Sequence, residues 1–160
     1  MKTLRTPLIL FIIGALVLSA CEQSRVYDKN MSIEASGWAY GERLTFEVMV
    51  NDTALTYNMF INVRHRDTYP YNNLWLNLTT QFPDSTSANT KVNVELSEPE
   101  GEWTGNCVDG ICYNSVLIQK NFRFPAKGKY LFTIEQDMRM NPLPGLMDVG
   151  MRVEKFAVAR

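Results

Sequence analysis

Apolar and polar residues alternate along most of the chain after residue 43, which is the two-residue period of a β-strand buried on one face. In residues 44–50 every even-numbered residue is apolar, whereas Thr45, Glu47 and Met49 lie between them. The same period recurs in six further segments: 57–64, 74–79, 92–96, 116–122, 130–136 and 149–155. No comparable run at helical spacing follows residue 21. The pattern therefore predicts an all-β protein.

Turn-forming residues separate these segments. They are Asn51-Asp52, Tyr69-Pro70, Phe82–Ser85, Pro99–Gly101, Asp109-Gly110, Lys127-Gly128 and Asn141-Pro142. About eight short strands punctuated by turns predict an antiparallel β-sandwich of two sheets. A closed β-barrel is the alternative architecture.

The first 21 residues follow a different pattern. Lys2 and Arg5 precede an uncharged apolar run over residues 8–18, and Leu18-Ser19-Ala20-Cys21 follows. The run is too short to span a hydrocarbon core of about 30 Å. The pattern resembles a bacterial lipoprotein signal peptide. That resemblance implies cleavage before Cys21 and acylation of its sulfur and new amino group, which would anchor the chain to a membrane.

This division predicts three regions: a signal peptide over residues 1–20, a lipidated N-terminus with a polar linker over 21–30, and a β-sandwich domain over 31–160. The linker is predicted because residues 22–30 are polar and show no period. Glu22 follows the lipidated cysteine. In enteric bacteria an aspartate at that position often signals retention in the inner membrane, so its absence here favours the outer membrane.

The charge balance narrows the class of partner. Without Lys2 and Arg5, which leave with the signal peptide, 14 of the 16 basic residues remain against 17 acidic ones. A slightly acidic domain lacks the basic surface that nucleic acid requires. It also lacks the basic cluster of a protein held on anionic lipid by charge alone.

Two cysteines flank a turn in Cys107-Val108-Asp109-Gly110-Ile111-Cys112. Asp-Gly favours the type I′ turn of a two-residue hairpin loop. In such a hairpin Cys107 faces Cys112 at a non-hydrogen-bonded position, where the Cα atoms lie about 4.5 Å apart and a disulfide can form. An oxidising envelope would preserve it. Free thiols, a redox pair or metal ligation remain alternatives.

Residues with catalytic potential are few. The sequence has no Gly-x-Ser-x-Gly elbow and no phosphate-binding loop. His65, the only histidine, ends a predicted strand and is interpreted as structural. Glu135 and Asp137 share a strand face with Arg139, which favours a solvated or ion-paired row over acid–base chemistry. We therefore expect no enzyme activity, cofactor, bound metal or small-molecule substrate.

Residues 138–147 form a proline-rich loop with unusually large apolar side chains. Such residues suggest a contact surface when they are exposed. The candidate contact residues are Arg139, Met140, Leu143, Leu146 and Met147. The alternative is that the loop folds back and plugs one end of the sandwich.

Several motifs carry a family resemblance. They are Tyr57-Asn58 with Arg64, Tyr69-Pro70, Asn73–Leu76, Gly101 with Trp103 and Gly105, Gln136–Arg139 with Leu143, and Asp148–Arg152. Together they resemble the GldH family of gliding-motility lipoproteins of Bacteroidetes. The resemblance extends from the lipoprotein signal to the last predicted strand.

The resemblance implies a non-enzymatic envelope lipoprotein that is needed for gliding and associated with type IX secretion, with other envelope proteins as partners. It also suggests O-glycosylation at Thr53, because Asp52-Thr53-Ala54 matches the acceptor pattern of exported Bacteroidetes proteins. The alternative function is an envelope carbohydrate- or peptidoglycan-binding module. It would use Trp38, Trp75, Trp103 or the tyrosines as stacking platforms.

Overall fold

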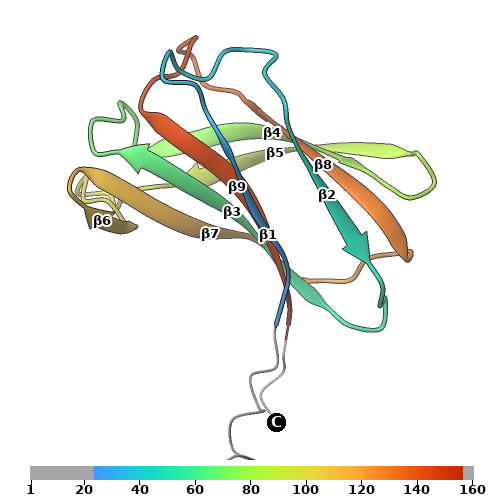
Figure 1. Ribbon diagram of the computed structural model, residues 1–160. Helices are drawn as coiled ribbons and strands as arrows, with labels where there is room; N and C mark the ends of the chain where they lie inside the picture. The colour runs from blue at the N-terminus through green and yellow to red at the C-terminus, as the bar shows by residue number, and fades with distance from the viewer. Residues whose placement is uncertain (1–23, 157–160) are drawn as a thin grey trace, which may run out of the picture.

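The computed structural model describes residues 24–156, which form two antiparallel sheets packed face to face (Figure 1). The nine strands are β1 (Arg25–Ser32), β2 (Leu44–Val50), β3 (Tyr57–Arg66), β4 (Asn73–Gln81), β5 (Ser87–Glu95), β6 (Asn106–Val108), β7 (Ile111–Phe122), β8 (Gly128–Gln136) and β9 (Leu146–Lys155). One sheet has the order β1-β9-β3-β7-β6 and the other β2-β8-β4-β5. The predicted all-β sandwich is confirmed, and the sheets do not close into a barrel.

The alternating pattern predicts the buried face of the strands correctly. In β2 every even-numbered residue from Leu44 to Val50 is buried and every odd-numbered one is exposed. Val149, Met151 and Val153 of β9 are fully buried in the facing sheet. The core thus forms between the two sheets from one face of each, which is the arrangement that period-two strands favour.

Strand β1 corrects the prediction of a linker over residues 21–30. Residues 25–30 belong to this edge strand, which pairs with β9 so that Tyr27 faces Val153 and Lys29 faces Met151. Its side chains are exposed at every position except the half-buried Tyr27. Backbone hydrogen bonds rather than buried side chains hold it, so the sequence shows no apolar period there.

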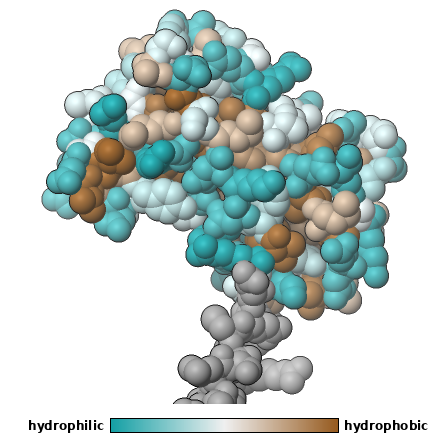
Figure 2. Space-filling view, viewed as in Figure 1, coloured by the Kyte–Doolittle hydropathy of each residue, from teal (hydrophilic) through white to brown (hydrophobic). Residues whose placement is uncertain are grey.

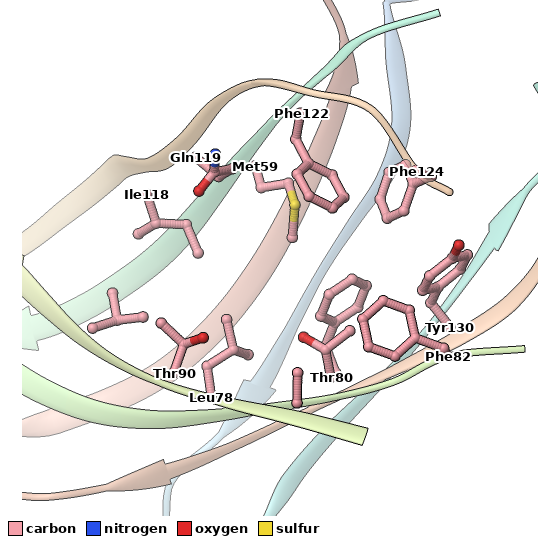
Figure 3. Close-up of a pocket in the computed structure, with 13 residues that line it drawn as sticks. Met59, Leu78, Thr80, Phe82, Thr90, Ile118, Gln119, Phe122, Phe124 and Tyr130 are labelled. Carbon is pink, nitrogen blue, oxygen red and sulfur yellow. The ribbon is translucent and has the colours of Figure 1, made fainter. Parts of the chain in front are cut away.

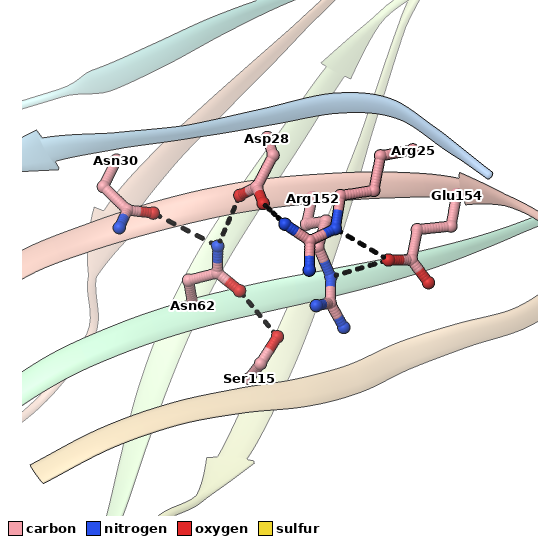
Figure 4. A network of polar contacts seen from close by, with 7 residues as sticks. All are labelled: Arg25, Asp28, Asn30, Asn62, Ser115, Arg152 and Glu154. Atoms are coloured by element: carbon pink, nitrogen blue, oxygen red, sulfur yellow. Dashed lines mark hydrogen bonds and ion pairs between the residues drawn. The ribbon is translucent and has the colours of Figure 1, made fainter. Parts of the chain in front are cut away.

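A polar layer fixes β1 to the outer face of its sheet (Figure 4). Asn62 of β3 is fully buried in this layer. Its Nδ2 donates to Asp28 Oδ1 at 3.0 Å and to Asn30 Oδ1 at 3.1 Å, and its Oδ1 accepts from Ser115 Oγ at 2.6 Å. Gly150 of β9 lies beneath Asn30, and a Cβ there would overlap Asn30 Oδ1. The network links β1, β3 and β7 across β9.

The strand directions define two ends of the sandwich. At the entry end β1 begins and β9 finishes, and the amide of Lys155 donates to the carbonyl of Ser24 at 2.8 Å. At the far end lie the segments 33–43 and 137–145, which precede β2 and β9. All nine strands and their shared core fall within residues 24–156, so this part of the chain contains a complete folding unit.

Candidate functional site

Cys21 lies outside the described residues, and its acylation remains a prediction. The described chain begins at Ser24, three residues later, at the entry end. Three extended residues span at most about 10 Å. An acylated Cys21 would therefore hold the entry end close to a membrane.

The loop between β8 and β9 folds back onto the far end of the sandwich. Trp38 and Leu143 pair as an isolated β-bridge, with both N–H···O distances at 2.9 Å. The side chain of Gln136 donates to the carbonyl oxygens of Trp38 and Met140, each at 3.3 Å. Gly37 has φ of 101° and lies against the backbone of Leu143, so that an added Cβ would meet Leu143 O at 2.9 Å. These contacts close the far end over the core.

The burial of this loop corrects part of the predicted contact surface. Leu143 is fully buried and Leu146 is 5% exposed, so placing these two residues on an exposed surface is wrong. Their side chains fill the end of the core, which is the alternative that the sequence left open. Met147 is half-buried, whereas Arg139 and Met140 are exposed.

Three exposed side chains lie at the far end, in segments next to the buried Met138. Tyr40 is 52% exposed, Trp75 38% and Met140 41%. The Tyr40 hydroxyl donates to the carbonyl of Met138, and the Trp75 amide donates to Met138 Sδ at 3.1 Å. With Arg139 these residues make up what we call the far-end surface. Tyr40 was missed because the irregular segment around it carries no strand period.

Two acidic side chains near this surface form ion pairs, with partners from other strands and segments. Glu135 Oε1 accepts from Arg43 Nε at 2.9 Å, and Asp137 pairs with Lys91. The hydrogen bond from Lys91 lowers the pKa of the Asp137 carboxyl. A carboxylate with a lowered pKa is ionised at neutral pH and is poorly suited to act as a general acid.

His65 belongs to a buried aromatic cluster. Its Nδ1 lies 2.8 Å from the carbonyl oxygen of Arg66, and its ring centroid lies 4.6 Å from that of Trp103 and 5.6 Å from that of Tyr69. The side chain is fully buried. A structural role explains this position. The structure nevertheless buries the ring more deeply than the sequence suggested.

The three tryptophans do not form a stacking platform for carbohydrate. Trp38 is fully buried, and its Nε1 donates to the carbonyl of Glu42 at 2.9 Å. Trp103 is half-buried against His65. Only Trp75 of the three is exposed. A sugar-binding surface built on all three indole rings is therefore inconsistent with the structure.

The predicted disulfide hairpin is present. Cys107 and Cys112 are joined, with Cα atoms 4.0 Å apart, and they pair across β6 and β7. Asp109 and Gly110 have φ of 51° and 76°, as a type I′ turn requires. Figure 2 shows an apolar patch over this hairpin, where Val108 is strongly exposed.

Thr53, the predicted glycosylation residue, lies in the loop between β2 and β3 at the entry end. It is half-buried. The neighbouring Asp52 Oδ1 accepts from the amide of Ala54 at 2.8 Å, and the Asp52 carbonyl accepts from the Tyr57 hydroxyl at 2.6 Å. These bonds shape the turn. Modification of Thr53 stays a prediction.

An apolar pocket opens between the sheets near the entry end, with a volume of about 240 Å³ (Figure 3). Ile118, Met59 and Phe122 approach it from the five-stranded sheet. Leu78 and Thr90 face them from the other sheet. The sequence pattern does not indicate this pocket, because apolar lining residues such as Leu78 and Ile118 look like ordinary core positions.

Metal ligands do not gather in the described part of the chain: residues 24–156 contain no cluster of three or more His, Cys, Asp or Glu side chains suited to a metal ion. That same segment has no helix long and apolar enough to span a membrane.

These features define a single antiparallel β-sandwich. The described chain begins at one end of it, and an apolar loop closes the other end. Residues 25–153 match the family described as GldH lipoprotein, and the chain belongs to that family. It is 32% identical over 153 residues to the gliding motility lipoprotein GldH homolog of Christiangramia forsetii, covering 91% of this chain and 93% of that protein. It is 29% identical over 153 residues to gliding motility lipoprotein GldH of Flavobacterium johnsoniae, covering 91% and 94%.

Proposed function

We propose that this protein is a lipid-anchored component of the cell envelope that acts in gliding motility by contacting other envelope proteins. The observation that carries the proposal is the family match over almost the whole sandwich, together with relatives named as gliding motility lipoproteins. The finer elements of the proposal are association with the type IX secretion assembly and location in the outer membrane.

Anchoring and partner contact are assigned to opposite ends of the sandwich. Acylated Cys21 would hold the entry end at the bilayer, since Ser24 already lies beside Lys155 there. Strand β9 has 10 residues, which at about 3.3 Å per residue places the far end roughly 30 Å away. The far-end surface would then project away from the membrane and be accessible to other proteins.

The state of the candidate catalytic groups supports the proposal of a non-enzymatic role. His65 is buried among aromatic rings, and Glu135 and Asp137 are each paired with a cation. We therefore assign the function to contact surfaces. Thr53 remains a proposed O-glycosylation residue, and an intact-mass measurement without any hexose-sized increment would exclude it.

The test is complementation of a strain that lacks this protein. Cys21→Ser should leave an unprocessed precursor that takes up no fatty-acid label and does not restore spreading of colonies. Ser24→Ala, a similarly small change just beyond the anchor, should be processed and labelled and should restore spreading. Restoration of spreading by an unlabelled Cys21→Ser protein would contradict the requirement for anchoring.

A further inference from the structure

The pocket between the sheets is lined mainly by apolar side chains. None of its 13 lining residues is charged; the polar groups are those of Thr80, Thr90 and Gln119 and the Tyr130 hydroxyl, which donates to the carbonyl of Ala126. Its volume of about 240 Å³ exceeds the roughly 150 Å³ of an apolar cavity that stays dry and binds benzene in another protein. A hydrocarbon group is therefore a better occupant than water.

The pocket has a buried floor and an open side. Met59, Leu78 and Phe132 of the floor are buried. Ala88 and Thr90 of β5 and Gln119 of β7 are exposed at its rim. β5 is the edge strand of its sheet, and β6 pairs only with residues 111–113 of β7, so β7 has no outer neighbour in the ladder at the pocket; no ladder joins β5 to β7. A flexible, narrow molecule could thus enter between these strands without breaking backbone pairing.

The pocket lies near the end of the sandwich where the described chain begins. Ser24 lies beside Lys155, which is opposite Tyr57, and Tyr57 is opposite the pocket residue Phe122. Three strand spacings of about 4.8 Å place Phe122 roughly 14 Å across the sheet from Ser24. The apolar pocket therefore lies at the same end of the sandwich as the predicted lipid anchor.

Charge beside the pocket favours an anionic headgroup. Residues 120–129 directly follow the pocket residues Ile118 and Gln119 and contain four basic residues and no acidic one. Of these four, Lys129 pairs with Glu47 at 3.5 Å. This local excess contrasts with the slightly acidic chain as a whole. Basic residues near a bilayer attract anionic phospholipids.

We propose that the pocket binds one hydrocarbon chain of an anionic membrane phospholipid, whose phosphate lies against the basic segment 120–129. The choice of a membrane lipid rests on the proposed anchoring through Cys21, whereas the affinity of the pocket for a lipid chain does not. Binding would orient the sandwich on the bilayer as well as tether it.

The test uses residues 22–160, which contain the whole described fold without the acylated cysteine. The probe is cis-parinaric acid, a fatty acid whose fluorescence rises in an apolar site. We expect saturable binding to the unmodified domain. Ile118→Trp, which fills the pocket, should weaken it at least tenfold. Leu117→Trp places the same ring at the neighbouring residue, on the outer face of β7, and should leave binding unchanged.

A second pair of variants covers the case in which Ile118→Trp does not fold, which a thermal melt would show. Thr90→Phe at the rim should weaken binding, whereas Asn89→Phe on the opposite face of the same strand should not. Absence of saturable binding to the unmodified domain would overturn the proposal. If the pocket variant and the control variant of a pair both fold and weaken probe binding equally, the proposal is also overturned.

Two further arms address the lipid source and the headgroup. Lys120→Gln with Arg123→Gln should weaken displacement of the probe by an anionic lysophospholipid several-fold, but not displacement by a neutral monoacylglycerol of the same chain length. Equal effects on both ligands would contradict the headgroup assignment. If the mature acylated protein cannot bind the probe in the same detergent in which residues 22–160 do bind it, the occupant is the protein's own acyl chain, which overturns the membrane-lipid source.

Discussion

Leu143 and Met140 lie in the same loop but differ in what surrounds them. Leu143 is fully buried, so Leu143→Ala should lower the free energy of unfolding by about 2–5 kcal/mol through lost burial and a residual cavity. Met140 is exposed, so Met140→Ala should change it by no more than about 0.5 kcal/mol. Urea unfolding of residues 22–160 measures both values. Similar small effects would show that the loop does not plug the core.

Two aspartates should affect stability with opposite dependence on pH. Burial raises the pKa of Asp148, although Arg64 opposes the shift, whereas the hydrogen bond from Lys91 lowers that of Asp137. The folded state therefore binds a proton at Asp148 more readily than the unfolded state does. Its contribution to stability is present below about pH 4 and is lost as pH rises through the folded pKa. The contribution of Asp137 is present above about pH 4 and is lost as pH falls.

We therefore expect Asp148→Asn to gain stability relative to the unmodified protein as pH rises from about 4. Asp137→Asn should be less stable than the unmodified protein at neutral pH, and this difference in stability should disappear as pH falls below about 4. Urea unfolding across a pH series measures both trends. Parallel trends for the two variants would contradict the assigned shifts.

At the scale of strands, the sequence predicts elements that bury one face and misses those that do not. β2 was predicted because Phe46, Val48 and their neighbours alternate with polar residues. β1 was missed because its stability comes from ladder bonds to β9 and from the Asn62 network, which depend on residues far apart in sequence. Trp38 was missed as a core residue for a similar reason, since its partner Leu143 lies in another loop.

The hairpin of β6 and β7 was predictable from local chemistry alone. Asp109-Gly110 specifies the turn, and the turn places Cys107 opposite Cys112. Closing so short a loop contributes about 2 kcal/mol in the chain-entropy estimate. Cys107→Ser with Cys112→Ala should lower the melting temperature of residues 22–160 by about 4–8 °C without unfolding them at room temperature. Complete loss of the cooperative transition would show that the fold depends on this disulfide.

At the scale of the molecule, the sequence predicted a tether and a contact loop but not their spatial relation. The structure places the start of β1 and the exposed Tyr40, Trp75 and Met140 at opposite ends. The far-end surface combines residues from three separate segments, so no single motif could reveal it. The apolar loop predicted as a contact surface contributes only its exposed part, because its remaining large side chains complete the core.

Quantitative co-purification from solubilised envelopes tests whether the far-end surface contacts partner proteins. Trp75→Ser with Met140→Glu alters the far-end surface. Tyr113→Ser with Met49→Glu is the matched control, because Tyr113 is 38% and Met49 49% exposed on the outer faces of the two sheets. Both variants should be acylated and should melt like the unmodified protein.

We expect the far-end variant to recover at least tenfold less of the envelope proteins captured by the unmodified protein, because a few central anchors usually carry most of the binding energy. The control should recover the same amounts as the unmodified protein. Undiminished recovery by the far-end variant, or an equal loss in the control, would contradict the assignment of partner contact to the far end.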